Sequence, residues 1–331
     1  MKLLFVGDVM LGRLVNECLK EQSFAYPWGD TLDVFRSADV RFCNLECVIS
    51  DKGEPWSITP KVFHFRSDRK NVSVLKNARI DCVSLANNHV LDYGYDAFFE
   101  MFEILKEEKI HYAGAGNDVE EARKPAVFEV GGCRIGLTDN EPIWEATNER
   151  SGTFYMPISA KGEERSNTGE FSRDLMNLIK RTKADVDILI VSAHWGSNWG
   201  YRPEPEHVGF SHFLVDCGAD IVFGHSCHVF RGVEIYQNRP IIYSAGDFID
   251  DYAVDSDERN DESFIFLVET EGTHIKGLKL YPTVIRNFQA RHAKGETGER
   301  IGQKMKLLCE ELDTAVRWNS GLKCLEVFVN E

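Results

Sequence analysis

Short apolar runs, separated by segments with helical periodicity, recur along most of this sequence. This alternation is typical of a mixed α/β fold, in which buried strands and covering helices follow one another along the chain. We predict strands at 2–6, 40–44, 81–86, 110–114, 126–130, 133–138, 187–193, 220–224, 233–237, 240–245 and 263–269. We predict helices at 11–20, 28–36, 68–77, 95–108, 170–183, 204–217 and 298–315. The expected fold class is therefore α/β.

Turn residues and polar stretches indicate how these elements are connected. Gly131-Gly132 and Gln237-Asn238 each separate two predicted strands, which predicts two hairpins. The polar segment 141–170 predicts a long excursion from the compact fold. We expect residues 1–285 to form one domain, and residues 286–331 to extend it with a helix and the strand-like run CLEVFV.

The net charge and the hydropathy of the chain limit the kinds of molecule that we expect it to bind. The chain has 331 residues, of which 43% are hydrophobic and 27% charged, an ordinary balance for a globular protein. Its 53 acidic residues outnumber 38 Lys and Arg, so the formal net charge is −15. Nucleic acids and anionic membranes attract basic surfaces, and we therefore expect no nucleic-acid partner. No run approaches the roughly 18 apolar residues of a membrane span, and we expect none.

The cysteines point to a reducing compartment. Nine of them are scattered through the chain, an odd number with no CxxC pair, which argues against a disulfide framework or a cysteine zinc site. The apolar start LLFV is too short for the core of a secretory signal. We therefore expect the protein to be cytoplasmic.

Polar residues follow the predicted strands at the point where each strand ends. These residues are Asp8, Asn44, Glu46, Asn87, Asn88, His89, His194, His225, His228 and Asp247. Each alone has an ordinary explanation, such as a helix cap, a turn or a core histidine. Open α/β sheets, however, bind ligands beyond the carboxyl ends of their strands, so one shared site explains all of them together. Carboxylate, amide and imidazole groups are ligands for divalent metal ions.

Six ordered motifs strengthen this hypothesis. GDVMLGR, NLE, ANNHVLDYG, HWG, GHSCHV and YSAGDF follow one another between residue 3 and about residue 250. Their order resembles the CapA family, named for poly-γ-glutamate capsule synthesis, within the calcineurin-like metallophosphoesterase superfamily. The resemblance implies a four-layer αββα sandwich with the site at the strand ends.

The resemblance also implies roles for individual residues. The implied metal ligands are Asp8, Glu46, Asn88, His194, His225 and His228. His89 would protonate a leaving group, with Asp92 as a candidate partner that orients it. Asp8 and His228 are further candidate catalytic residues.

Three departures from the superfamily pattern bear on the metal. Met10 stands where the superfamily has a histidine, and Glu46 replaces its bridging aspartate. His225 and His228 are three residues apart rather than two. The implied cofactor is a divalent ion, Mn, Zn, Fe or Mg, and the site could hold two ions, one or none.

Three activities remain open at this point. The first is metal-dependent hydrolysis or transfer on a phosphoester or on a peptide-like, γ-glutamyl substrate. The second is a metal-independent peptide epimerase, in which Asp8 and either His225 or His228 exchange a proton on opposite faces of the substrate. The third is a non-catalytic accessory protein of polymer synthesis. For either enzymatic activity, the expected partner is a small-molecule or peptide-like substrate. The oligomeric state is open.

Candidate substrate-binding residues flank the motifs. Arg13 follows the first motif and could hold an anion as a fork. Trp195 directly follows His194, and we expect it to line a pocket. Arg202 and Asp247 complete this set.

Overall fold

The computed structural model describes residues 1–139 and 168–329, so almost all of the excursion expected at 141–170 lies outside the described residues. The helices in these ranges are α1 (Arg13–Cys18), α2 (Leu32–Ser37), α3 (Val72–Asn77), α4 (Gly94–Glu107), α5 (Val119–Ala122), α6 (Thr168–Asp185), α7 (Pro205–Cys217) and α8 (Gly295–Glu310). The strands are β1 (Lys2–Val9), β2 (Val40–Leu45), β3 (Val48–Ile49), β4 (Arg66–Ser67), β5 (Cys82–Ser84), β6 (His111–Ala113), β7 (Ala126–Val130), β8 (Cys133–Asp139), β9 (Ile188–His194), β10 (Ile221–His225), β11 (Val233–Tyr236), β12 (Arg239–Ile242), β13 (Asp247–Ile249), β14 (Glu262–Glu271), β15 (His274–Arg286), β16 (Gln289–His292), β17 (Val316–Asn319) and β18 (Cys324–Phe328). The predicted α/β class is confirmed.

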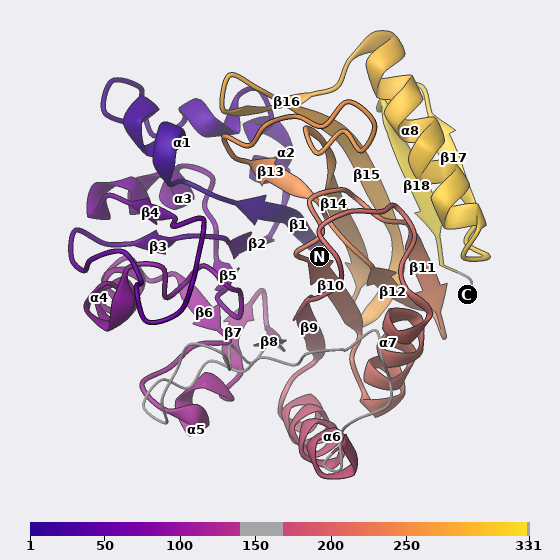
Figure 1. The fold of residues 1–331 in the computed structure, drawn as a ribbon. Helices are drawn as coiled ribbons and strands as arrows, with labels where there is room; N and C mark the ends of the chain where they lie inside the picture. The colour runs from indigo at the N-terminus through magenta and orange to yellow at the C-terminus, as the bar shows by residue number, and fades with distance from the viewer. Residues whose placement is uncertain (140–167, 330–331) are drawn as a thin grey trace.

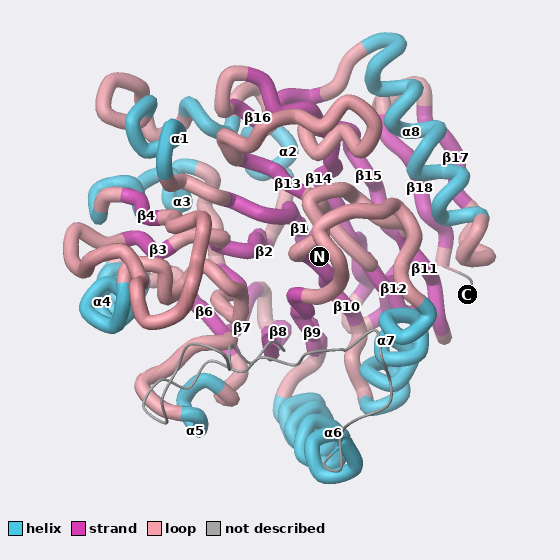
Figure 2. The backbone as a smooth tube through the Cα atoms, viewed as in Figure 1, coloured by secondary structure: helices cyan, strands magenta, loops and turns pink. Residues whose placement is uncertain are grey.

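Most of these strands belong to two large sheets (Figures 1 and 2). The larger has the order β17-β18-β15-β14-β1-β2-β5-β6, and the smaller has the order β11-β12-β10-β9-β8-β7. Strands β1, β2, β5 and β6 run parallel to one another, as do β8, β9, β10 and β12. Each sheet therefore has a parallel half whose strands all end at the same edge.

The buried apolar side chains form three clusters, because successive side chains of a strand point to opposite faces of its sheet. Leu3 and Phe5 of β1 face the smaller sheet, whereas Leu4 and Val6 face helices α1–α4. Successive side chains of a strand point to opposite faces, so a run that is apolar throughout is buried on both sides. Phe5 meets Phe223 of β10 across the two sheets, with ring centroids 5.2 Å apart. A third cluster joins the outer face of the smaller sheet to α6 and α7.

The two predicted hairpins are confirmed. Gly131-Gly132 connects β7 to β8, and Gln237-Asn238 connects β11 to β12, with positive φ at all four residues. Two central residues with positive φ match the twist of the strands that they join.

Strand β15 is absent from the sequence prediction, although it is the longest in the described ranges. It pairs with β14, β16 and β18. Pro282 lies within it, and a proline lowers the expectation of a strand because it has no N–H for the ladder. The ladder tolerates it here because its carbonyl still accepts from Ala293.

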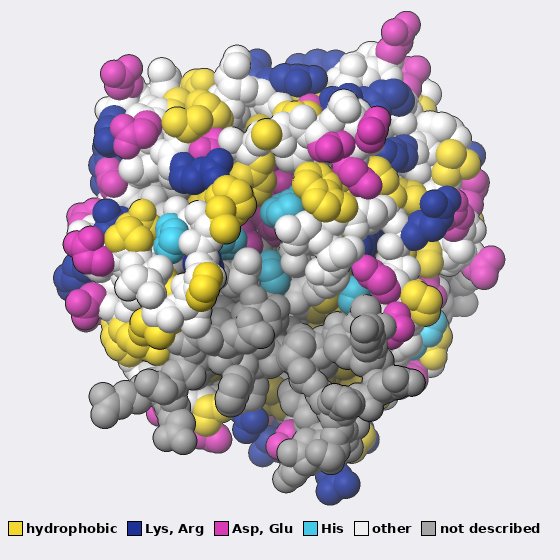
Figure 3. All heavy atoms as spheres, in the orientation of Figure 1, with side chains coloured by type: hydrophobic (Ala, Val, Ile, Leu, Met, Phe, Trp, Pro, Cys, Tyr) yellow, Lys and Arg dark blue, Asp and Glu magenta, His cyan; other side chains and the backbone are white. Residues whose placement is uncertain are grey.

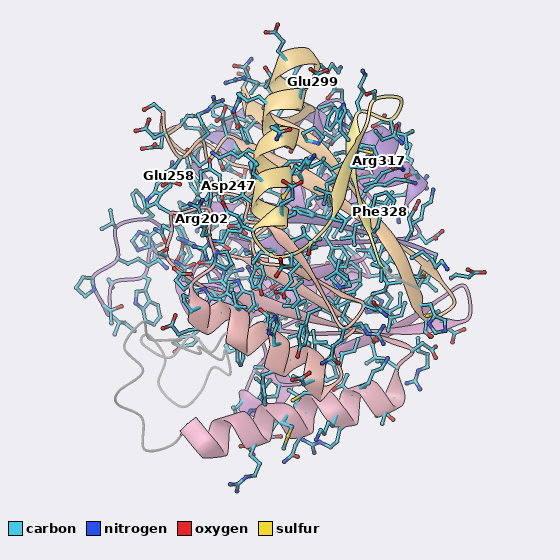
Figure 4. All side chains as sticks on the ribbon, turned by 90° about the vertical axis from the view of Figure 1, so that its right-hand side faces the viewer. Arg202, Asp247, Glu258, Glu299, Arg317 and Phe328 are labelled. Carbon is cyan, nitrogen blue, oxygen red and sulfur yellow. The ribbon has the colours of Figure 1, made fainter. Side chains whose placement is uncertain are left out.

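The C-terminal part extends the larger sheet. Helix α8 lies against β17 and β18, and β18 pairs with β15 (Figure 4). Ile301 and Met305 of α8 join the apolar cluster between the two sheets. No helix in residues 1–139 or 168–329 combines the length and apolar composition that a bilayer crossing requires.

Candidate metal centre

The carboxyl ends of the parallel strands from both sheets meet at one place. Asp8 of β1 lies beside Asn44 of β2 and Asp247 of β13, and His225 of β10 lies beside His194 of β9. A cavity of about 590 Å³ opens above these ends, and its lining includes Glu46, Asn88, His89, His194 and His228. Figure 3 shows histidine and acidic side chains inside a hollow near the middle of this face, with hydrophobic side chains around it.

Glycines bring the backbones close enough to place the first aspartate and His225. The Asp8 N–H donates to the Gly246 carbonyl at 3.0 Å. A Cβ on Gly7 would lie 1.8 Å from that same carbonyl oxygen, and a Cβ on Gly224 would lie 2.3 Å from the carbonyl oxygen of Tyr243. The Gly-Asp and Gly-His pairs of the sequence thus allow a close approach of neighbouring strands directly before each polar residue.

Asp8, His228 and Asp247 form the tightest group of potential ligands. One ligand atom from each lies within 4.8 Å of the others. His228 Nδ1 is 3.0 Å from Asp247 Oδ1, and Asn44 donates to Asp8 Oδ1 at 2.8 Å. The second carboxylate oxygens of Asp8, Asp247 and Asp250 are buried and accept no hydrogen bond from the described residues. Buried oxygens without a donor fit a bound cation.

Burial also shows in the pKa values of these acids. It raises the pKa of Asp8 to about 6, although Asn44 donates to its carboxylate. Burial, reinforced by the neighbouring carboxylates, raises the pKa values of Asp247 and Asp250 well above the usual range. Such a group of acids requires protons or a cation to be stable in the interior, and a divalent ion satisfies this requirement.

Glu46 connects this group to the histidines. Its Oε1 lies 3.9 Å from His89 Nε2, and its Oε2 lies 3.9 Å from His194 Nδ1. The Asn44 side-chain amide donates to both Glu46 and Asp8. Asn88 lines the cavity, and its side-chain oxygen is buried without a hydrogen-bond donor from the described residues. Carboxylate, imidazole and amide groups are the types of ligand that divalent ions bind.

His225 lies behind His194 rather than in the cavity lining. Its Nδ1 is 3.0 Å from His194 Nδ1, and its Nε2 is 2.8 Å from Ser192 Oγ. Burial lowers the pKa of His225 to about 3. The contacts at both ring nitrogens position His194, and such partners orient the ligands of metal sites.

His89 is oriented by a carboxylate that also binds a lysine. Asp92 Oδ2 is 2.6 Å from His89 Nδ1, and Asp92 Oδ1 is 2.5 Å from Lys61 Nζ. Burial lowers the pKa of His89, and Asp92 opposes this shift. The ring stacks on Phe65 at 4.0 Å between centroids, so that Nε2 faces Glu46.

The predicted substrate-binding residues lie in different parts of the structure. Arg13 lines the cavity and forms a bidentate pair with Asp251. Asp247 lies in the acidic group described above. Trp195 is buried under α7 and donates to the Tyr243 carbonyl, and Arg202 pairs with Glu311 on the surface, so neither is part of the cavity lining.

Other cavity residues escaped the sequence analysis. They are Lys61, Val62, Phe63, Phe65, Asn198, Ser226, Tyr252, Ala253 and Asn260. The first four lie in the segment 50–65, which has no helix or strand between β3 and β4. Long connections without secondary structure are often functional, so this segment carried a usable signal. Met10 is buried, and its sulfur accepts from the Gly12 N–H rather than reaching the site.

The fold and the donor set define a mixed α/β protein with a candidate divalent-metal site at the strand ends. The chain belongs to the family described as "Bacterial capsule synthesis protein PGA_cap", which matches residues 2–252. The resemblance to CapA proteins is therefore confirmed.

Two curated relatives illustrate this family. A "Probable polyglutamine synthesis accessory protein" of Mycobacterium tuberculosis is 37% identical over 257 residues, which cover 74% of this chain and 65% of the relative. The "Capsule biosynthesis protein CapA" of Bacillus anthracis is 28% identical, with 74% of this chain and 59% of the relative covered. The chain thus spans less than two thirds of the length of either relative.

A solved structure supports the fold. A hypothetical protein of Thermus thermophilus superposes with a TM-score of 0.51 and 16% sequence identity. The match covers 85% of this chain and 98% of that protein.

Proposed function

We propose that this chain is a metal-dependent hydrolase of anionic esters. The observation that carries the proposal is the group Asp8, Asp247 and His228, whose ligand atoms lie within 4.8 Å while two carboxylate oxygens lack donors. Glu46, His194 and Asn88 offer ligands for a second ion. A bound divalent ion supplies hydrolytic chemistry by lowering the pKa of water and polarising the ester.

The chain's own residues supply the remaining steps. Arg13 holds the anionic group of the substrate in the cavity, and Asp251 fixes the direction of its guanidinium. The protonated form of His89 gives its Nε2 proton to the leaving group, while its Nδ1–H donates to Asp92. The proposed general acid shares one cavity with four of the proposed ligands, Glu46, Asn88, His194 and His228, and this division of roles requires such proximity.

The epimerase alternative needs two proton-transfer groups on opposite faces of the substrate. Asp8 and His228 instead belong to one group of ligand atoms within 4.8 Å. This arrangement favours metal binding over proton exchange.

The test combines metal content with turnover. Protein purified without chelator should contain Mn, Zn, Fe or Mg, and should hydrolyse 4-nitrophenyl phosphate in the presence of Mn²⁺. Asp8→Asn and His194→Ala should remain folded but lose both metal and turnover, while the surface variant Arg202→Ala should keep both. Full turnover in the two site variants would contradict the assignment. A parallel assay with γ-glutamyl-4-nitroanilide decides between ester and γ-glutamyl hydrolysis.

A non-catalytic accessory role in polymer synthesis is the second candidate. The description of one relative as a synthesis accessory protein favours it. A chain with this role would stabilise a synthesis complex without hydrolysing either substrate, so the same assays separate the two candidates.

We also propose that the fold is a four-layer αββα sandwich and that the protein acts in the cytoplasm. The three apolar clusters, placed between helices, sheet, sheet and helices, support the four-layer αββα sandwich. All nine cysteines are unpaired, which supports the cytoplasm as the site of action.

A further inference from the structure

Four aromatic side chains surround the cavity, and together we call them the aromatic collar: Phe63, Phe65, Trp199 and Tyr252. The collar is continuous with two imidazoles of the site, those of His89 and His228. Phe65 stacks on His89 at 4.0 Å and lies 5.7 Å from Tyr252. His228 lies 5.1 Å from Tyr252 and 5.9 Å from Trp199.

The outer members of the collar are exposed, and hydrogen bonds and an ion pair hold the segments that carry them. The exposed fractions are 57% for Phe63 and 42% for Trp199. The buried Arg231 donates to the carbonyls of Trp199 and Gly200, and the His228 N–H donates to the Asn198 carbonyl. Phe63 is flanked by two residues that both bind Asp92, through the Lys61 ammonium and the Phe65 N–H. Because these segments are held, less freedom is lost when the two rings close around a ligand.

The collar also touches the proposed anion-binding residue. The Arg13 guanidinium lies 5.3 to 5.7 Å from the ring centroids of Phe65, Tyr252 and Phe63. A single small molecule can therefore place an anionic group at Arg13 and an adjacent flat group against the collar. A cavity of about 590 Å³ is larger than a phosphate group needs and is in the range that holds a small organic ligand.

We infer that the substrate is an anionic ester that carries a planar aromatic ring next to the reacting group, and that Phe63 and Trp199 bind this ring. Stacking on an aromatic side chain accounts for roughly tenfold or more in affinity. The inference rests on the proposed function for the anionic end of the ligand, but its test does not require turnover.

The test measures binding of phosphonates, whose P–C bond is not hydrolysed. Isothermal titration in the presence of Mn²⁺ should show phenylphosphonate binding about tenfold tighter than methylphosphonate. In the double variant Phe63→Ala, Trp199→Ala this ratio should fall below about threefold. Val254→Ala is the matched control, because Val254 is 51% exposed but is not part of the cavity lining, and it should keep the wild-type ratio.

Three results would overturn the inference: equal binding of the two phosphonates, no binding of either, or an unchanged ratio in the double variant. Cyclohexylphosphonate that binds as tightly as phenylphosphonate would overturn the requirement for a planar ring.

The experiments distinguish a failure of this inference from a failure of the proposed hydrolase function. Collar-dependent phosphonate binding without hydrolysis of any ester refutes only the hydrolase, whereas hydrolysis lost in Asp8→Asn without a preference for phenylphosphonate refutes only the collar.

Discussion

At the scale of single residues, Asn44 shows how a neutral side chain holds a group of acids together. Its side-chain nitrogen donates to both Asp8 and Glu46, and its oxygen accepts from Asn87 at 2.9 Å. All four side chains are buried. Asn87 also accepts from the His89 N–H, so the amide pair connects the proposed metal ligands to the loop of the proposed general acid. An amide can make these contacts because it carries donors and acceptors on one short side chain.

Replacing Asn44 by aspartate should destabilise the protein. The variant removes two hydrogen bonds to buried carboxylates and adds a third carboxylate, which we expect to lower the free energy of unfolding by about 2–4 kcal/mol. Urea denaturation in the presence of a chelator measures this change. Asn177→Asp, on the exposed side of α6, makes the same chemical change and should alter stability by less than about 0.5 kcal/mol. Equal effects of the two substitutions would show that Asn44 does not hold the acids.

At the scale of elements, the site lies at the ends of strands. The positions of these strand ends depend on a close approach between the backbones of neighbouring strands. Strand β1 contacts β2 and β13 in parallel, and its register with β2 shifts between Val6 and Asp8. The shift falls at Gly7, where only a hydrogen atom fits beside the Gly246 carbonyl. The shift turns Asp8 toward both neighbours, because an irregularity at a strand end changes the direction of the following side chain.

Gly7→Ala should disrupt this junction. A Cβ at 1.8 Å from the Gly246 oxygen forces β1 and β13 apart and removes the hydrogen bond from the Asp8 N–H. We expect a loss of about 3 kcal/mol or more in the free energy of unfolding, or no folded protein at all. The control is Gly209→Ala in α7, where a Cβ meets no atom within 4 Å and should stabilise the helix by about 0.5–1 kcal/mol. Chemical denaturation compares the two, and a Gly7→Ala protein of wild-type stability would contradict the argument.

At the scale of the whole molecule, the interface between the two sheets holds the site together. The larger sheet contributes Asp8 and Asp247, Glu46 directly follows its strand β2, and the smaller sheet contributes His194. Neither sheet alone carries all of the proposed ligands. Phe5, Phe42 and Phe223 form a continuous aromatic contact across the interface, with centroids 4.9 and 5.2 Å apart. Helix α8 packs into the same cluster, so the C-terminal extension is part of one core.

Phe223→Ala should therefore affect the entire chain. Removing this buried ring leaves a cavity between the sheets, and we expect a loss of about 3–5 kcal/mol in the free energy of unfolding. Urea transitions followed by fluorescence and by far-ultraviolet circular dichroism should shift together, as expected for one cooperative unit. Phe328→Ala, with its ring 46% exposed on β18, should cost less than about 1 kcal/mol. Separate transitions in the Phe223 variant would indicate two independently folding parts.

The sequence by itself determined the α/β class, the two hairpin turns and the edge at which polar residues gather. These features are local, because apolar runs, turn residues and strand ends can be recognised from neighbours in the chain. Strand β15 escaped because its proline contradicts the local rule, and long-range pairing with β14, β16 and β18 outweighs it.

Only the tertiary structure decided which of the polar residues lie together and which neighbours each of them contacts. His225 and His228 are three residues apart, yet one supports His194 from behind while the other joins Asp8 and Asp247. Trp195 and Trp199 lie in one loop, yet the first is buried under α7 and the second is at the cavity mouth. The direction of a side chain at a strand end depends on the register and packing of strands far away in the sequence, and spacing along the chain does not contain that information.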